Sequence, residues 1–260
     1  MSSAAPAGFF DDLRSISLRA IRLTWRDPEA FLPALVIPVF FFVVNVGALQ
    51  TFVEGSFPRG FDYKAFQLPV AVVFAVTGVS RANALVLDIQ DGYFDRLLLT
   101  PVRRVTLLLG LMTADVVLIV ALAIPVALLG LIVGIRPATG LLGVVAFVLM
   151  AGLWGLAFTG FPYSIALRTG NPTAVNNAFL LFFPFAFLTT AYLPQASMTG
   201  WLAVATKFNP TTYLLEGMRA LLQEGWAWAA IGRSLAAIAG VGAVSFSLAF
   251  AALRGRVKRN

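Results

Sequence analysis

A segment rich in ionisable side chains, residues 88–104, lies between two long apolar stretches of the sequence. It contains Asp88, Asp91, Asp95, Arg96, Arg103, Arg104 and the leucine run Leu97–Leu99. Because ionised groups are costly to bury, the segment must face water or a protein partner. A solvated loop would not need leucines beside its acids. We therefore predict a short helix that docks a cytoplasmic protein on its polar face and anchors to the rest of the chain through its leucines.

The composition excludes several kinds of catalytic and metal chemistry. The 260 residues include no cysteine and no histidine, which removes disulfides, Cys/His zinc sites, thiol nucleophiles and Ser-His-Asp triads. The lysines Lys64, Lys207 and Lys258 do not follow a glycine, whereas a phosphate-binding P-loop needs Gly-Lys-Ser or Gly-Lys-Thr. We expect no enzyme activity, no metal site and no cofactor in this chain.

The balance of apolar and charged residues is typical of an integral membrane protein. Hydrophobic residues make up 59% of the chain and charged residues 12%, compared with about 25% in soluble domains. The net charge of +7 comes from arginines clustered at the ends of apolar stretches, which indicates cytoplasmic loops rather than nucleic-acid binding. No cleavable signal peptide is expected, because Asp11 and Asp12 precede the basic residues and the first long apolar run starts near Ala30.

Apolar runs of about 20 residues predict six membrane-spanning helices in an all-α fold. Their approximate bounds are residues 30–50, 66–87, 105–134, 140–167, 172–193 and 232–253. In the second run Arg81 stands about two turns before Asp88, so either the helix projects into the cytoplasm or Arg81 snorkels. We divide the chain into an amphipathic N-terminal part (residues 1–28), a transmembrane domain (29–253) and a basic tail (254–260).

The distribution of basic residues predicts that both termini are cytoplasmic. With that orientation the cytoplasmic side carries Arg14, Arg19, Arg22, Arg26, Arg96, Arg103, Arg104, Arg168, Arg254, Arg256, Lys258 and Arg259. The outer side carries Arg59, Lys64, Arg136, Lys207 and Arg219. The positive-inside rule favours this arrangement, which places residues 88–104 in the cytoplasm between the second and third helices.

Two further elements are predicted not to span. Residues 9–26 place arginines on one helical face and apolar residues on another, which is typical of an amphipathic helix lying on the inner surface. Residues 194–233 form a long outer connection between the fifth and sixth helices. In this connection Asn209-Pro210 predicts a helix start, and Glu216 can pair with Arg219 across one turn. We expect a helical element that re-enters the outer leaflet.

Two features inside the predicted spans are candidates for transport chemistry. Asp115 lies in the third span, where a carboxylate suggests proton coupling; the alternatives are an interhelical hydrogen bond or a position near the inner interface. The fifth span is unusually aromatic, and its rings could line a path for a flat apolar substrate, face lipid or fill the bundle. The candidate path residues are Asn176, Phe179, Phe182, Phe183 and Phe187.

Three stretches of the sequence resemble the ABC-2 type transporter permease family, and in particular its daunorubicin/doxorubicin-resistance exporters. Residues 23–29, Leu-Thr-Trp-Arg-Asp-Pro-Glu, are similar to the Arg-Asp-Pro entry to the first span. Residues 91–102 are similar to a Glu-x-Gly-Thr-x-Glu-x-Leu…Thr-Pro segment, with aspartate for both glutamates and Tyr93 for threonine. Residues 208–222 resemble an Asn-Pro-x-x-Tyr…Glu-x-x-Arg element. The matches follow the family order across nearly the whole chain.

The resemblance implies the permease subunit of an exporter of hydrophobic or amphipathic compounds, such as drugs, lipids or secondary metabolites. Two permease subunits, identical or paralogous, would form a path between them, and two copies of a separate cytoplasmic ATPase would bind ATP and Mg. The residues implied in coupling to the ATPase are Arg22, Arg26, Asp88, Asp91, Gly92, Asp95, Arg96, Leu97 and Pro101. Those implied at the outer gate are Asn209, Pro210, Tyr213, Glu216 and Arg219. We expect a multi-pass protein of a bacterial cytoplasmic membrane.

Two other functions stay open at this point. One is a secondary carrier driven by protons through Asp115, although the sequence contains no evident inverted repeat. The other is a membrane scaffold that recruits a cytoplasmic protein without transporting anything.

Overall fold

The computed structural model describes residues 28–57, 60–77, 79–98 and 104–257, and the regular secondary structure of these residues is helical, with no strand. The elements are α2 (Pro28–Ser56), α3 (Tyr63–Thr77), α4 (Ala82–Gln90), α5 (Tyr93–Leu98), α6 (Arg104–Ile132), α7 (Gly140–Thr169), α8 (Pro172–Phe187), the short 3₁₀ turn η1 (Gln195–Ser197), α9 (Gly200–Phe208), α10 (Pro210–Gln223) and α11 (Trp228–Val257). The all-α class is therefore confirmed. The predicted surface helix, residues 9–26, lies outside the described residues.

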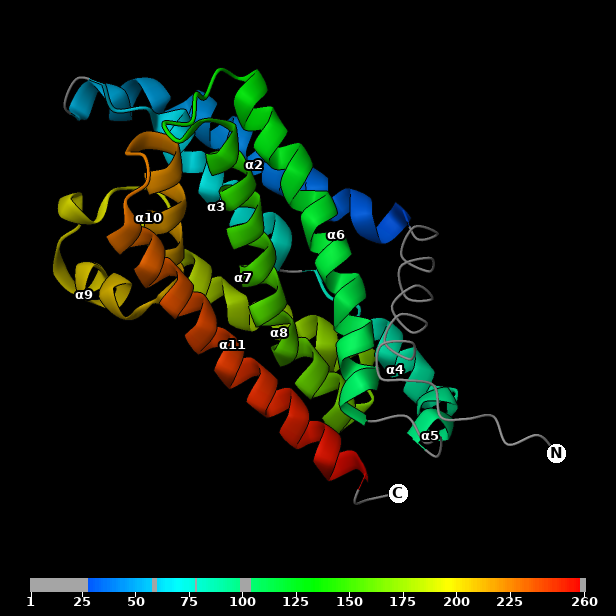
Figure 1. Ribbon diagram of the computed structural model, residues 1–260. Helices are drawn as coiled ribbons and strands as arrows, with labels where there is room; N and C mark the ends of the chain where they lie inside the picture. The colour runs from blue at the N-terminus through cyan, green and yellow to red at the C-terminus, as the bar shows by residue number, and fades with distance from the viewer. Residues whose placement is uncertain (1–27, 58–59, 78, 99–103, 258–260) are drawn as a thin grey trace.

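Five stretches in the described part of the chain are helical, long and apolar enough to cross a membrane. They are Leu32–Ser56, Tyr63–Gln90, Leu108–Ile132, Gly140–Thr169 and Trp228–Val257, which match five of the predicted spans. The remaining predicted span contains α8, which has 16 residues, fewer than the roughly 20 that a spanning helix needs. A six-span topology stays a prediction. Figure 1 shows α4 and α5 toward the same end of the bundle as the C-terminal end of α11, with α9 and α10 toward the other end.

The second span is broken rather than continuous, which the sequence prediction of one helix over residues 66–87 did not include. The helix α3 ends at Thr77, Val79 and Ser80 are not helical, and α4 begins after Arg81. The Ser80 hydroxyl accepts a hydrogen bond from the backbone N–H of Ala82 at 3.1 Å, which satisfies one of the free amides at the start of α4. Arg81 is the N-cap residue of α4, so it lies at the break between α3 and α4 and not within one continuous helix.

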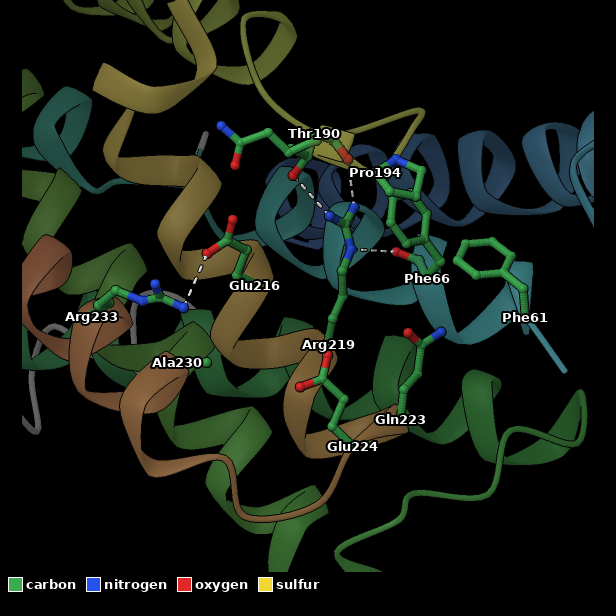
Figure 2. Close-up of a pocket in the computed structure, with 11 residues that line it drawn as sticks. Phe61, Phe66, Thr190, Pro194, Glu216, Arg219, Gln223, Glu224, Ala230 and Arg233 are labelled. Carbon is green, nitrogen blue, oxygen red and sulfur yellow. Dashed lines mark hydrogen bonds and ion pairs between the residues drawn. The ribbon is translucent and has the colours of Figure 1, made fainter. Parts of the chain in front are cut away.

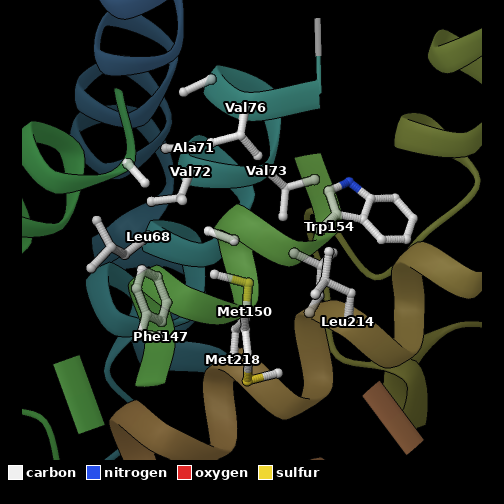
Figure 3. Packing of buried hydrophobic residues seen from close by; sticks show 14 of the residues in the cluster. Leu68, Ala71, Val72, Val73, Val76, Phe147, Met150, Trp154, Leu214 and Met218 are labelled. Carbon is white, nitrogen blue, oxygen red and sulfur yellow. The ribbon is translucent and has the colours of Figure 1, made fainter. Parts of the chain in front are cut away.

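The buried side chains form two main cores at different depths of the bundle. The α10-side core joins α3, α6, α7 and α10, and Figure 3 shows Phe147 beside Met150 and Met218, with Trp154 near Leu214 on the other side of the same core. The α4-side core is made from α4, α5 and the neighbouring ends of α6, α7 and α11; its larger members are Leu85, Ile89, Phe94, Leu108, Met112, Tyr163, Leu167 and Leu253. The break in the second span separates the two: α3 packs in the first core and α4 in the second.

The outside of the bundle is apolar on several helices, as a lipid-facing surface requires. Large exposed side chains on α2 include Leu32, Val36, Phe40 and Val43, and those on α7 include Leu141, Leu142 and Val145. In water such a contiguous apolar surface would favour aggregation, whereas in a bilayer it contacts the hydrocarbon chains of the lipids.

The long helices α7 and α11 cross at a glycine. A Cβ atom added to Gly160 would lie 2.5 Å from the Ser245 carbonyl carbon, so only glycine fits there. At the same crossing the Ser245 hydroxyl donates a hydrogen bond to the Ala157 carbonyl oxygen. Gly240, elsewhere on α11, has by contrast open space around its Cα.

We expect Gly160→Ala to destabilise the protein by about 1–3 kcal/mol, the usual effect of overpacking a tight contact. The methyl group would meet the backbone of α11, which cannot rotate away as a flexible side chain would. Gly240→Ala is the matched control, because it adds the same methyl group to open space on α11. Thermal unfolding in detergent should show a lower Tm for Gly160→Ala alone; equal Tm values for both variants would contradict the tight crossing.

Candidate functional site

The turn between α4 and α5 carries the central part of the predicted coupling segment. The Asp91 N–H donates to the Leu87 carbonyl at 2.9 Å and the Gly92 N–H donates to the Ile89 carbonyl at 3.1 Å, which closes α4. Gly92 has a φ of +69°, a left-handed conformation that glycine adopts without strain and that reverses the chain at a helix end. The structure therefore holds Asp91 in a tight turn, with its side chain exposed to solvent.

Two described side chains of the short helix α5 lie on opposite sides, and the docking role of this helix stays a prediction. Arg96 is exposed, whereas Phe94 is 2% exposed and packs in the α4-side core. We predicted that the leucines anchor this helix and did not single out Phe94; its spacing of one turn from Leu97 was the available signal. Asp88 is half-buried on α4 and interacts with neighbouring groups.

Part of the predicted site cannot be placed. Arg22, Arg26 and Pro101 lie outside the described residues, as do the side chains of Asp95, Leu97 and Phe179.

The helix α4 is tied by side chains to the connection between α7 and α8. Asn83 Nδ2 donates to Asn176 Oδ1 at 2.6 Å, and Gln90 Nε2 donates to the Gly170 carbonyl at 3.0 Å. Asn176, predicted as a path residue, therefore links α8 to α4. The two bonds join α4 to α8 and to the residue that caps the end of α7.

At the other end of the bundle, Asn209 joins α10 to the end of α8. Its side-chain oxygen accepts from the Thr211 N–H at 2.9 Å, and Pro210 occupies the first turn, so the predicted helix start is confirmed. Its Nδ2 donates to the Phe185 and Leu188 carbonyls at 2.6 and 2.8 Å. One asparagine thus caps α10 and binds the carbonyls where α8 ends.

Arg219 is the most deeply buried cation among the described residues, 6% exposed, and it connects three segments. Its guanidinium donates to the Phe66 carbonyl at 3.0 Å, to Thr190 Oγ1 at 2.8 Å and to the Thr190 carbonyl at 2.7 Å. The guanidinium carbon also lies 3.5 Å from the centroid of the Phe66 ring, a cation–π contact. Figure 2 shows this side chain reaching between α3 and the chain after α8.

The ion pair predicted between Glu216 and Arg219 is replaced by a different one. Glu216 Oε2 lies 3.8 Å from Arg233 Nη2 on α11, and Arg219 turns instead toward the oxygens of Thr190 and Phe66. The physical reason is one of position: Arg219 is buried against oxygens of α3 and of the chain after α8, whereas the Glu216 side chain is 28% exposed and faces α11. Burial lowers the pKa of Arg219 to about 9, which still leaves the guanidinium charged at pH 7.

A cavity of about 400 Å³ opens beside Arg219, between α3, α10, the start of α11 and the chain after α8. Its lining combines both signs of charge with aromatic rings: Phe61, Phe66, Thr190, Pro194, Gln195, Glu216, Arg219, Gln223, Glu224, Ala230 and Arg233. Tyr213 is not in this lining; its hydroxyl donates to the Lys207 carbonyl at 2.6 Å and fixes α9 against α10.

The aromatic residues of α8 divide into two groups. Phe182 is fully buried and packs edge-on against Phe74 and Phe158, with ring centroids 5.6 and 5.5 Å apart. Phe183 and Phe187 are exposed and stack on each other at 5.7 Å. Phe182 therefore fills the bundle, whereas Phe183 and Phe187 present a row of rings on its surface.

Long apolar helices with exposed apolar faces, five of them long enough to cross a bilayer in the described part of the chain, define a multi-pass membrane protein. Residues 11–222 match the ABC-2 type transporter family, and the chain belongs to that family. It is 28% identical over 202 residues to the daunorubicin resistance ABC transporter permease protein DrrB1 of Streptomyces coeruleorubidus, covering 76% of this chain and 70% of that protein. It is also similar to the transport permease ycf38 of Pyropia yezoensis (24% over 220 residues, 81% and 73% covered) and of Porphyra purpurea (23% over 212 residues, 80% and 72% covered).

The family resemblance drawn from the sequence motifs is thereby confirmed, and the chain is the membrane subunit of an ABC transporter. The residues of its candidate site lie in two groups at opposite ends of the bundle: the α4–α5 turn, and the cluster around Arg219 and Asn209.

Proposed function

We propose that this permease works with a separate cytoplasmic ATPase to export hydrophobic or amphipathic molecules from a bacterial cell. Family membership supports the transporter class, and the relative whose name refers to daunorubicin resistance supports a cargo of this chemistry. The lack of a Gly-Lys-Ser/Thr sequence fits ATP and Mg being held by the partner. The observation that carries the proposal is the α4–α5 turn, which is charged and exposed outside and packed on Phe94 inside.

The turn would receive the motion of the ATPase. A partner shifts a conformational equilibrium only through contacts that differ between two states, and exposed Asp91 and Arg96 can supply them. Because α4 and α5 pack in the same core as α6, α7 and α11, displacement of the turn moves these helices with it. Arg22, Arg26, Asp88, Asp95, Leu97 and Pro101 complete the proposed docking surface.

The cluster around Arg219 would form the outer gate. Asn209 and Arg219 bind α10 to the ends of α8 and α3, so that opening would require these buried hydrogen bonds to rearrange together. The polar cavity beside Arg219 would then be the first compartment outside the path. In the same proposal both termini are cytoplasmic, α8 completes six spans, and two permease subunits, identical or paralogous, enclose the cargo between them.

The proposal is tested by co-expressing the chain with the ATPase encoded beside it. We expect a stable complex whose ATP hydrolysis in liposomes rises with daunorubicin, together with ATP-dependent movement of daunorubicin across the membrane. A stable complex whose ATPase rate ignores every cargo offered would support the scaffold alternative. Transport without the ATPase, driven by a pH gradient, would support the carrier alternative and overturn the proposal.

A further inference from the structure

The break in the second span is held from both sides by side chains of neighbouring helices. On the α3 side, Trp154 Nε1 of α7 donates to the Thr77 hydroxyl at 2.9 Å, at the last residue of α3. On the α4 side, Asp115 Oδ1 of α6 accepts from the backbone N–H of Arg81 at 2.9 Å, at the N-cap of α4. The start of α4 is thus bound to α6 by a side chain 34 positions away.

Asp115 occupies an expensive place for a carboxyl group. The residue is 0% exposed, and Oδ2 has no well-formed hydrogen bond, although the nearby Tyr163 hydroxyl interacts with it. Burying an acid in a membrane bundle costs free energy, so such a residue usually has a functional role. The contact that it does make is to the backbone N–H of Arg81, the N-cap residue of α4, one of the amides at a helix start that have no partner within the helix.

The position of this bond matters because the break separates two packed bodies. The α4–α5 unit belongs to the α4-side core, and α3 belongs to the α10-side core. Among the described residues of this connection, Val79 and Ser80 are not helical, and a chain that leaves the helical conformation there can bend. The Asp115–Arg81 bond therefore ties the start of α4 directly to α6, in addition to the core packing that α4 and α6 share.

We propose that Asp115 is a positioning residue for transport: its carboxylate fixes the start of α4 on α6, so that displacement of the α4–α5 turn is passed into the third span. This inference rests on the proposed coupling to an ATPase. It gives Asp115 a structural acceptor role in place of proton transfer.

Substitutions at Asp115 separate the acceptor role from the proton role. Asp115→Asn keeps a side-chain oxygen for the Arg81 N–H, whereas Asp115→Leu and Asp115→Ala remove it. For both apolar variants in liposomes with the ATPase, we expect an intact complex and continued ATP hydrolysis, with daunorubicin transported per ATP reduced about tenfold, within the usual range for coupling between sites. Asp115→Asn should stay within about twofold of the parent protein, because the bond that carries the coupling is kept. Thr113→Val is the matched control, because the Thr113 hydroxyl donates only to the Leu109 carbonyl of its own helix.

A distance measurement tests the same bond without any transport. The chain has no cysteine, so spin labels can be placed on Leu87→Cys of α4 and Ile124→Cys of α6, both exposed. We expect the distance distribution between the labels to broaden in Asp115→Leu and Asp115→Ala and to stay narrow in Asp115→Asn. A label pair at Ile124→Cys and Leu153→Cys, on α6 and α7, should not change in any variant.

The outcomes distinguish this inference from the proposed function. Unchanged Leu87–Ile124 distances in both apolar variants would overturn the positioning role. Loss of transport in Asp115→Asn as large as in Asp115→Leu would also overturn it, in favour of proton transfer. If the parent protein transports nothing with the ATPase, the proposed function fails and the coupling role fails with it, while the label distances still decide whether Asp115 holds α4.

Discussion

Replacing Arg219 with leucine is expected to lower the free energy of unfolding by about 2–5 kcal/mol, because buried oxygens that lose a charged donor cost about 1–3 kcal/mol each. The guanidinium donates three hydrogen bonds, to Phe66 and Thr190, and packs on the Phe66 ring. Leucine fills part of the space but donates nothing. Arg219→Lys should be intermediate, since an ammonium keeps the charge and loses the planar fork.

The matched control for Arg219 is Arg233, which lines the same cavity. Arg233 is 61% exposed and faces Glu216 at 3.8 Å, so Arg233→Leu should cost about 0–1 kcal/mol, the usual range for exposed ion pairs. Denaturant unfolding in detergent micelles, with the same detergent for all variants, measures the difference. Equal losses for both arginines would show that charge at the cavity, rather than the buried hydrogen bonds, sets stability.

Reversing the charge of Asp91 is expected to weaken binding of the ATPase about tenfold or more, since like charges brought together at an interface cost several kcal/mol. Asp91 is exposed and forms the C-cap of α4. An acid at a helix C-terminus is unfavourable for the helix dipole, whereas a lysine there is favourable. Asp91→Lys should therefore preserve or slightly stabilise the fold, and weaker binding could not be attributed to unfolding.

Glu224→Lys is a close control for this variant. Glu224 is also an exposed acid at a helix C-cap, that of α10, and its N–H bonds to the Ala220 carbonyl at 2.9 Å, as that of Asp91 does to Leu87. We expect no change in ATPase affinity for Glu224→Lys. The affinities of Asp91→Lys and of the parent protein for the ATPase should differ at low salt and become similar at high salt, because salt screens exposed charges. An unchanged affinity for Asp91→Lys at low salt would remove the docking role from the α4–α5 turn.

The features that the sequence predicted correctly are those set by neighbouring residues. Apolar runs define the spans, and the pair Asn209-Pro210 sets its own helix start through an N-cap and a fixed φ. The partners of Arg219 could not be found this way. Its predicted partner was Glu216, three residues away, but its hydrogen bonds reach Phe66, 153 positions away, and Thr190, 29 positions away.

The break in the second span was missed for a similar reason. Arg81 was recognised as an interruption, but its backbone is held by Asp115 from another helix, and apolar periodicity carries no information on such a contact. Phe94 was also missed, because the prediction assigned the buried side to the leucine run, although its spacing of one helical turn from Leu97 could have indicated it.

The crossing of α7 and α11 at Gly160 has a mechanical consequence. Each of these helices has 30 residues, which corresponds to about 45 Å of length, whereas the hydrocarbon layer is about 30 Å thick. Helices of this length relieve the mismatch by tilting. Because Gly160 brings the two backbones into direct contact, the angle between the helices is fixed, and we expect both to tilt together in the bilayer. The broken second span, α3 and α4, then moves relative to α7 and α11, whose tilt depends in part on the thickness of the membrane.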